Sequence, residues 1–279
     1  MKILITGGTG MLGSTLSKKL FSMNHQVFAL SSEEFDITNN QSILESLDKN
    51  KPDLVINCAA YTNVEMAEEE KDKAMEINGY APGRLAKILH EKGIKLIHIS
   101  TDYVFGDNNI NGHLEEETPK TPALNYYGET KRIGEIEVMN ANPESYIARV
   151  QWSFGPGGKN IVDTMLMLAQ TKTELSIVVD EVGIPTYTGY MADNLAYMVE
   201  NISTLKPGYY HIVSEGSCSR FEQVKYIYEI AGINMKLNQI KLSEYPRKAK
   251  VPNFSILKNT KLPKLPDWKE GIKEYINSK

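Results

Sequence analysis

The chain has 279 residues, of which 41% are hydrophobic and 24% are charged, as in an ordinary globular protein. Its formal net charge is −4 and it has no basic stripe, which argues against a nucleic-acid partner. The sequence predicts no membrane partner and no catalytic metal, because it lacks long apolar runs and metal-ligand spacings of His or Cys. Without a recognisable signal peptide, we expect a cytoplasmic protein.

Strands and helices alternate through the first 150 residues. Hydrophobic runs predict strands at 3–5, 26–30, 53–57, 95–100 and 146–150, and helical spacing predicts helices at 12–20, 43–47, 66–78, 82–91 and 128–139. This alternation is typical of βαβ units with right-handed crossovers. We therefore predict an α/β fold, in which residues 1–150 form a Rossmann-type, doubly wound parallel sheet.

The pattern loosens after residue 150. Loops rich in glycine and proline appear at 155–158 and 183–185, and a short strand is predicted at 176–179. We interpret residues 151–279 as mainly a smaller C-terminal substrate-binding lobe, from which some segments return to the main sheet.

Three glycines stand between the first strand and the first helix. Gly7 permits a tight turn, Gly10 lets the backbone approach a pyrophosphate, and Gly13 lets the helix pack closely on the sheet. The N-terminus of the helix supplies free N–H groups and partial positive charge. Three glycines alone are weak evidence, but this strand–turn–helix context predicts a dinucleotide site.

The end of the second strand bears on which nicotinamide cofactor binds. Enzymes that use NAD usually carry an acidic residue there, which binds the ribose 2′-OH. Here the strand ends in Leu30, Ser31 and Ser32, and Glu33 and Glu34 follow later. The two serines tolerate a 2′-phosphate on the cofactor better than the carboxylate of an Asp or Glu at the same place would. The sequence therefore favours NADPH and leaves NADH open.

A tyrosine and a lysine four residues apart, Tyr127 and Lys131, lie on one face of a predicted helix. The preceding strand ends in Ser100 and Thr101, at the edge where open α/β sheets bind ligands. A ketone that accepts hydride needs a hydrogen-bond donor and a proton. We expect Thr101 to bind the carbonyl oxygen, Tyr127 to deliver the proton, and the Lys131 cation to favour the phenolate and bind the nicotinamide ribose.

The sequence also resembles the dTDP-4-dehydrorhamnose reductase family of extended short-chain dehydrogenases. Matching stretches span nearly the whole chain, at 35–38, 57–62, 100–105, 125–131, 149–152, 183–188 and 265–268. Together they are specific for this family rather than for the fold alone. The resemblance implies NADPH-dependent reduction of the C4 ketone of a nucleotide-activated 4-keto-6-deoxy sugar.

The resemblance also implies roles for particular residues. Gly10, Met11 and Leu12 would meet the cofactor phosphates, Asp36 and Ile37 the adenine end, and Ala60, Tyr61 and Thr62 the centre of the cofactor. The catalytic residues would be Thr101, Tyr127 and Lys131, and Tyr127 and Lys131 would also contact the cofactor. Asp102 and Trp152 would contact the sugar nucleotide; for Trp152 alone, core packing would be an equal alternative.

Some positions depart from the family pattern. The usual Arg-Thr-Ser-Trp-Val stretch has Gln151 in place of serine, and Val251 replaces an arginine before a proline in the late substrate loop. Arg247 and Lys250 are candidates to replace that arginine. Some relatives bind magnesium at a dimer interface through an acidic residue of the first helix; the corresponding stretch here is Ser14-Thr15, so we carry over no metal, and a homodimer stays open.

Three alternatives stay open. The first is a reductase of a UDP-linked 4-keto-6-deoxy-N-acetylhexosamine, which would share fold, cofactor and mechanism. The second is a non-catalytic regulatory subunit, against which the intact Thr101, Tyr127 and Lys131 argue. The third is a 4-epimerase or dehydratase. A dehydratase would need a second acidic residue beside Asp102, and the sequence lacks one.

Overall fold

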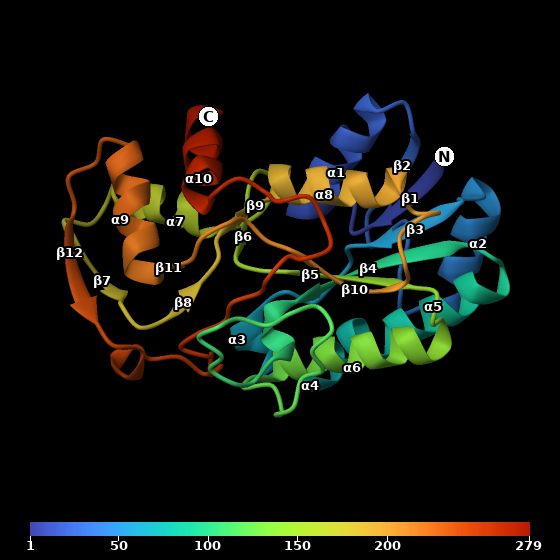
Figure 1. Ribbon diagram of the computed structural model, residues 1–279, viewed down its shortest axis with the longest axis horizontal. Coiled ribbons are helices and arrows are strands. Elements are labelled where there is room, and N and C mark those ends of the chain that lie inside the picture. The colour runs from blue at the N-terminus through green and yellow to red at the C-terminus, as the bar shows by residue number, and fades with distance from the viewer.

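A six-stranded parallel sheet forms the centre of the larger lobe in the computed structural model, which describes all 279 residues (Figure 1). The strand order is β10–β5–β4–β3–β1–β2. The strands are β1 (Lys2–Thr6), β2 (Gln26–Leu30), β3 (Leu54–Asn57), β4 (Lys95–Thr101), β5 (Tyr146–Val150) and β10 (Gly208–Ile212). The sheet confirms the predicted Rossmann-type architecture.

Helices cover both faces of this sheet. One face carries α1 (Met11–Ser22) and α8 (Thr188–Glu200), and the other carries α2 (Asn40–Asn50), α5 (Ala81–Glu91) and α6 (Tyr126–Ala141) (Figure 1). Successive residues of a strand point to opposite faces, so Ile3 and Ile5 pack beneath α1 and α8, whereas Leu4 packs with α2 and α5. The two hydrophobic cores hold the strand ends in fixed positions.

Parts of the second half of the chain belong to this sheet. Strand β10 pairs in parallel with β5, and α8 packs beside α1. Residues 188–212 therefore lie with the larger lobe, although they come after residue 150.

The smaller lobe surrounds a core of its own. It contains α7 (Ile161–Leu168), α9 (Arg220–Ile230), α10 (Trp268–Asn277), the parallel pair β7 (Glu174–Val178) and β12 (Lys236–Ile240), and the 3-10 turn η3 (Leu242–Glu244). Two short pairs join it to the larger lobe: β6 (Ser153–Phe154) with β9 (Thr186–Tyr187), and β8 (Val182–Gly183) with β11 (Cys218–Ser219). Phe154, Trp268 and Tyr275 contribute large side chains to this core.

The predicted helix over 66–78 is wrong. The structure has α3 (Val64–Ala67), α4 (Lys71–Met75) and a π-helical turn, η1 (Glu76–Tyr80), that continues into α5. Glu70 breaks the run because its backbone, with φ −90° and ψ 49°, is not helical. The strand predicted at 176–179 lies two residues earlier at its start, as β7.

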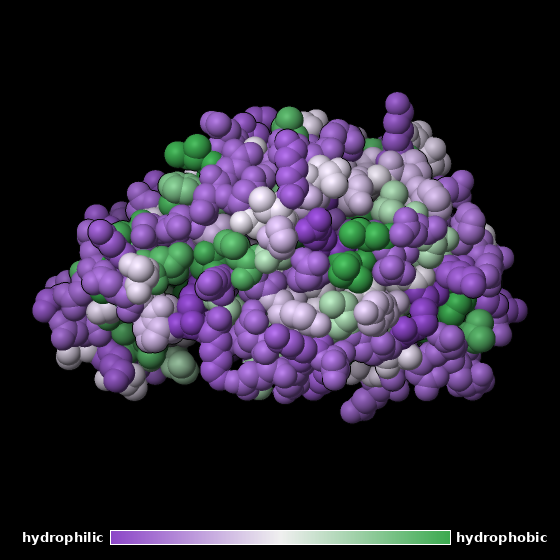
Figure 2. Space-filling view, turned by 90° about the horizontal axis from the view of Figure 1, so that it is seen from below, coloured by the Kyte–Doolittle hydropathy of each residue, from purple (hydrophilic) through white to green (hydrophobic).

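The face that Figure 2 shows is mainly hydrophilic, with patches of hydrophobic residues on its left half, toward the smaller lobe, and also on its right half. None of the helices combines the length and the apolar character needed to cross a membrane.

Candidate active site

The glycine turn after β1 is shaped to approach a ligand with backbone alone. Gly7 has φ 60°, and a Cβ there would lie 2.9 Å from the Ala59 nitrogen; a Cβ at Gly13 would lie 2.4 Å from the Gly7 oxygen. Gly10 is exposed and is the N-cap of α1, but no side chain caps the helix. The first N–H groups of α1, from Met11 and Leu12, are thus left for an anion, as a dinucleotide phosphate requires.

In the segment after β2, the acidic side chains form hydrogen bonds with residues of the same segment. Glu34 accepts a hydrogen bond from the Ser31 nitrogen at 2.9 Å, and this contact is the largest cause of the lowered pKa of its carboxyl. The Asp36 carboxylate accepts from both the nitrogen and the hydroxyl of Thr38, at 2.9 and 2.7 Å. Ile37 is buried beneath the turn. Asp36 therefore shapes the loop at the adenine end of the predicted cofactor site.

The segment of Ala60, Tyr61 and Thr62 follows β3 and is tied down by a residue that the sequence analysis did not single out. The Asn78 side chain accepts from the Tyr61 nitrogen at 2.8 Å and donates to the Tyr61 oxygen at 2.9 Å. It also donates to the Thr130 hydroxyl on α6 at 3.1 Å. Asn78 lies in the π-helical turn η1, and such turns are frequent at functional sites. In the sequence, only the Asn78-Gly79 dipeptide marks this position, and it gives no indication of these contacts.

The three predicted catalytic residues come from two neighbouring elements. Thr101 ends β4, while Tyr127 and Lys131 lie in the first turns of α6, whose N-cap is Asn125. The neighbouring Ser100 donates to Glu135 at 2.6 Å inside the protein, so Thr101 is the hydroxyl left at the edge of the sheet. The rings of Tyr127 and Tyr103 meet edge to face, with centroids 6.2 Å apart.

Burial dominates the electrostatics of this group. Desolvation and the charge of Asp102 raise the pKa of Tyr127 above its ordinary value, and the polar hydroxyl of Thr101 partly opposes them. Desolvation lowers the pKa of Lys131 to about 8, against the pull of Glu135. The Lys131 ammonium donates to the Ile99 oxygen at 2.7 Å and lies 3.4 Å from His98 Nε2. The expected lowering of the Tyr127 pKa by Lys131 is absent from this arrangement, because the cation is held at the strand.

Asp102 sits in a dense polar cluster. Its Oδ1 accepts from the Thr101 hydroxyl at 3.0 Å, and its Oδ2 accepts from Ser255 Oγ at 2.5 Å and Gln151 Nε2 at 3.1 Å. All four residues are buried. Burial raises the pKa of the Asp102 carboxyl to about 6, although the hydrogen bonds lower it.

Trp152 follows β5 in a strained conformation, with φ 41°. Its ring lies against Gly183, where a Cβ would be 2.5 Å from Trp152 Cε2, and the Arg220 guanidinium stacks on the ring at 3.2 Å from the centroid. Left-handed backbone in a bulky residue is rare outside functional sites. The strained backbone is consistent with the binding role that the resemblance implies for Trp152, and that role stays a prediction.

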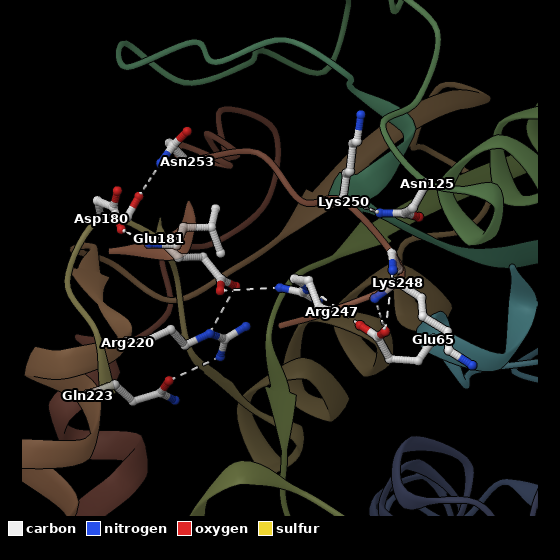
Figure 3. Close-up of polar contacts among 12 residues, drawn as sticks. Glu65, Asn125, Asp180, Glu181, Arg220, Gln223, Arg247, Lys248, Lys250 and Asn253 are labelled. Atoms are coloured by element: carbon white, nitrogen blue, oxygen red, sulfur yellow. Dashed lines mark hydrogen bonds and ion pairs between the residues drawn. The ribbon is translucent and has the colours of Figure 1, made fainter. Parts of the chain in front are cut away.

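Arg247 occupies a bridging position between the two lobes. It pairs with Glu65 of α3 at 3.3 Å and with Glu181 of the smaller lobe at 3.6 Å, and Glu181 also pairs with Arg220 at 3.1 Å (Figure 3). The side chain of Lys250 points away from Arg247 in the same view. Val251 is buried. Of the two candidates for the missing arginine, Arg247 is thus the one in contact with the interlobe network.

These residues converge on one edge of the sheet. Strands β1 and β4 are separated only by β3, so the glycine turn and Thr101 end roughly 10 Å apart at the same carboxyl edge. The sequence analysis did not foresee Asn78 or Ser255, and it noted Gln151 only as a departure from the family pattern. Their contacts bridge 17 to 153 positions of the chain, and no local pattern reports them.

A Rossmann sheet with a glycine turn after β1 and a tyrosine–lysine pair on α6 defines the extended short-chain dehydrogenase/reductase class. Within that class, residues 1–279 match the family described as the RmlD substrate binding domain, and the chain belongs to this family.

Named relatives agree with this placement. The chain is 35% identical to the spore coat polysaccharide biosynthesis protein SpsK of Bacillus subtilis, over 100% of this chain and 98% of that protein. It is 34% identical to the dTDP-4-dehydrorhamnose reductase of Escherichia coli, over 99% and 97%.

Solved structures with the same enzyme name match closely. The dTDP-4-dehydrorhamnose reductase of Clostridium acetobutylicum superposes with a TM-score of 0.94 at 37% identity, over 100% of this chain and 99% of that one. The enzyme of Bacillus anthracis, solved in complex with NADP, has a TM-score of 0.93 at 32% identity, with both chains fully covered.

Proposed function

We propose that this chain is an NADPH-dependent nucleotide-sugar 4-ketoreductase and that its substrate is dTDP-4-dehydrorhamnose. The observation that carries the proposal is the meeting of Thr101, Tyr127 and Lys131 at the sheet edge that also holds the glycine turn. The names of the full-length relatives support the substrate.

The glycine turn fits a nicotinamide dinucleotide, because it has no side chains to keep the cofactor away from its backbone. A Cβ in this turn would collide with Ala59 or Gly7. Gly7, Gly10, Met11, Leu12 and Gly13 would hold the phosphates. The adenine end would lie at Asp36 and Ile37, and the centre of the cofactor at Ala60, Tyr61 and Thr62. NADPH, when bound, supplies the hydride.

The side chains of this protein handle the oxygen and its proton. Thr101 donates a hydrogen bond to the C4 oxygen, and Tyr127 delivers the proton that converts the developing alkoxide to an alcohol. Burial raises the Tyr127 pKa, so the phenol carries its proton at neutral pH and can donate it only to the strongly basic alkoxide. The buried ammonium of Lys131 would hold the ribose end of the cofactor. Asp102 and Trp152 bind the sugar.

Oxidation of NADPH at 340 nm tests the proposal. The wild type is assayed with dTDP-4-dehydrorhamnose and, in parallel, with a UDP-4-keto-6-deoxy-N-acetylhexosamine. Tyr127→Phe is expected to reduce kcat by about 100-fold or more while NADPH still binds, because only the proton donor is lost. The neighbouring Tyr126→Phe is the matched control and should retain activity.

Each outcome decides between the candidate functions. Preference for the UDP sugar would indicate that Val251, in place of the usual arginine, accompanies a changed substrate specificity. Binding of NADPH without turnover of either sugar would contradict the reductase and favour a regulatory subunit. We propose further that residues 151–279 mainly bind substrate and that the protein works in the cytoplasm. The homodimer that the sequence leaves open is tested by analytical ultracentrifugation.

A further inference from the structure

The carboxylate of Asp102 is held from one side by two residues that do not belong to the proposed catalytic group. Thr101 pairs in register with Val150, so the residues that follow them, Asp102 and Gln151, meet just beyond the two strand ends. Gln151 Nε2 then donates to Asp102 Oδ2. Ser255 approaches the same oxygen from a distant segment, which is fixed by its own backbone bond from Ser255 N to the Val182 oxygen at 3.0 Å.

The two donors also hold each other. Gln151 Nε2 makes a second, short contact with the Ser255 backbone oxygen, so its amide is oriented by two acceptors. Gln151 Oε1 is buried and has no partner, which is the cost of presenting the nitrogen to Asp102. The opposite orientation of the amide would place Oε1 against the Asp102 carboxylate and the Ser255 carbonyl oxygen, which offer no proton, so the nitrogen faces Asp102.

The other oxygen of Asp102 controls Thr101. A threonine hydroxyl has one proton, and here it is donated to Asp102 Oδ1 at 3.0 Å. The same proton is needed by the C4 oxygen of a bound sugar. A strongly basic Oδ1 would retain it, whereas donors on Oδ2 withdraw charge from the carboxylate and weaken its hold on Thr101.

We propose that Gln151 and Ser255 are positioning residues for reduction: they fix the Asp102 carboxylate in its ionised form and thereby set the direction of the Thr101 hydroxyl. A sugar hydroxyl beside the ketone then donates to Asp102 Oδ1, and the Thr101 proton turns to the C4 oxygen. The substrate class this requires is a keto sugar with a free hydroxyl next to its ketone. The inference rests on the proposed reductase function.

The pH dependence of kcat/KM is the first test. Activity is expected to fall as the pH drops through the Asp102 midpoint, because the protonated acid no longer accepts from the sugar. Ser255→Ala removes one donor that stabilises the ionised form, and Gln151→Ser shortens the other side chain so that its hydroxyl no longer reaches Asp102 Oδ2. In each variant the acidic limb should move to higher pH by about one unit. Ser255→Thr keeps the hydroxyl and should leave the limb in place.

A purely structural role would give a different result. If Ser255 and Gln151 had only a structural role, Ser255→Ala and Gln151→Ser would lower the activity by the same factor at every pH, and the acidic limb would not move. This result would overturn the proposal. Thermal unfolding and NADPH affinity are measured on each variant, and both should stay close to the wild type. Ser255→Ala removes a single oxygen atom, so it alone can test the proposal if Gln151→Ser folds poorly.

Carboxyl NMR separates this inference from the proposed function. Asp102 is followed by its ¹³C carboxyl shift in labelled protein without substrate, and Asp102→Asn assigns the signal. A midpoint that rises in Ser255→Ala but not in Ser255→Thr supports the inference even if no sugar is turned over. A midpoint that is unchanged overturns it even in an active reductase.

Discussion

Lys131 is a buried cation whose charge is poised near physiological pH. Desolvation lowers its pKa to about 8, and its ammonium donates to the Ile99 oxygen and faces His98. Desolvation also lowers the pKa of His98 well below its ordinary value, so the imidazole is neutral and adds no positive charge. Lys131 is therefore protonated below about pH 8 and loses its charge as the pH rises through that value.

This lowered pKa predicts that NADPH binding weakens at alkaline pH. The protonated lysine binds the cofactor better, so the dissociation constant should rise by about tenfold between about pH 7 and about pH 9, as expected for the loss of one charge-assisted hydrogen bond. Fluorescence titration of NADPH measures it. Lys131→Met should bind more weakly and show no such dependence. A wild-type affinity that is flat across this range would remove Lys131 from the cofactor site.

At the scale of elements, helix α6 is fastened to the sheet by a buried ion pair. Glu135 accepts from Arg149 Nε and Nη2 at 2.8 and 2.7 Å, and Ser100 donates to the same carboxylate. The Arg149 guanidinium also lies 4.8 and 4.4 Å from the ring centroids of Phe105 and Tyr209. This pair joins α6, which carries Tyr127, to β4 and β5.

Breaking one side of this pair should be costly. Glu135→Leu leaves the Arg149 charge buried without a partner, and the free energy of unfolding is expected to fall by about 3–5 kcal/mol. The double variant Glu135→Leu/Arg149→Met removes both charges and should recover most of that loss. Urea denaturation followed by circular dichroism measures all three proteins. If the free energy of unfolding falls equally in the single and double variants, the two side chains stabilise the protein through packing and not because their charges compensate each other.

The sequence predicted those elements whose signals are local. The run before Gly7 and the leucines of α1 give strand, turn and helix within 22 residues, and the Tyr127–Lys131 spacing lies within one helix. The charged stretch over 66–78 misled the prediction because charge and helical spacing do not reveal the break at Glu70. Asn78 and Ser255 act through contacts between distant segments, and these exist only after the sheet has assembled.

At the scale of the whole molecule, residues 246–250 form a strap from the smaller lobe to the larger one. Glu65 accepts from the backbone nitrogens of Lys248 and Ala249 at 2.8 and 3.3 Å and pairs with Arg247. Farther along the strap, Asn125 donates to the Lys250 oxygen at 2.8 Å (Figure 3). Asn125 is also the N-cap of α6, so the strap meets the helix that carries Tyr127.

Glu65 is therefore expected to control how firmly the strap is docked. Glu65→Ala removes two backbone hydrogen bonds and one ion pair, each of which contributes about 1 kcal/mol or somewhat more, and the strap should open more often. Trypsin cleaves after Arg247 and Lys248, so the rate of cleavage there should rise by about tenfold or more, while the KM for the sugar nucleotide increases.

Glu69→Ala is the matched control, because Glu69 contacts only the exposed Lys248 side chain. It should change the cleavage rate little, since exposed ion pairs contribute little to stability. If Glu65→Ala and Glu69→Ala are cleaved at the same rate, the backbone bonds to Glu65 do not hold the strap, and the closure of the two lobes depends on Asn125 and Glu181 instead.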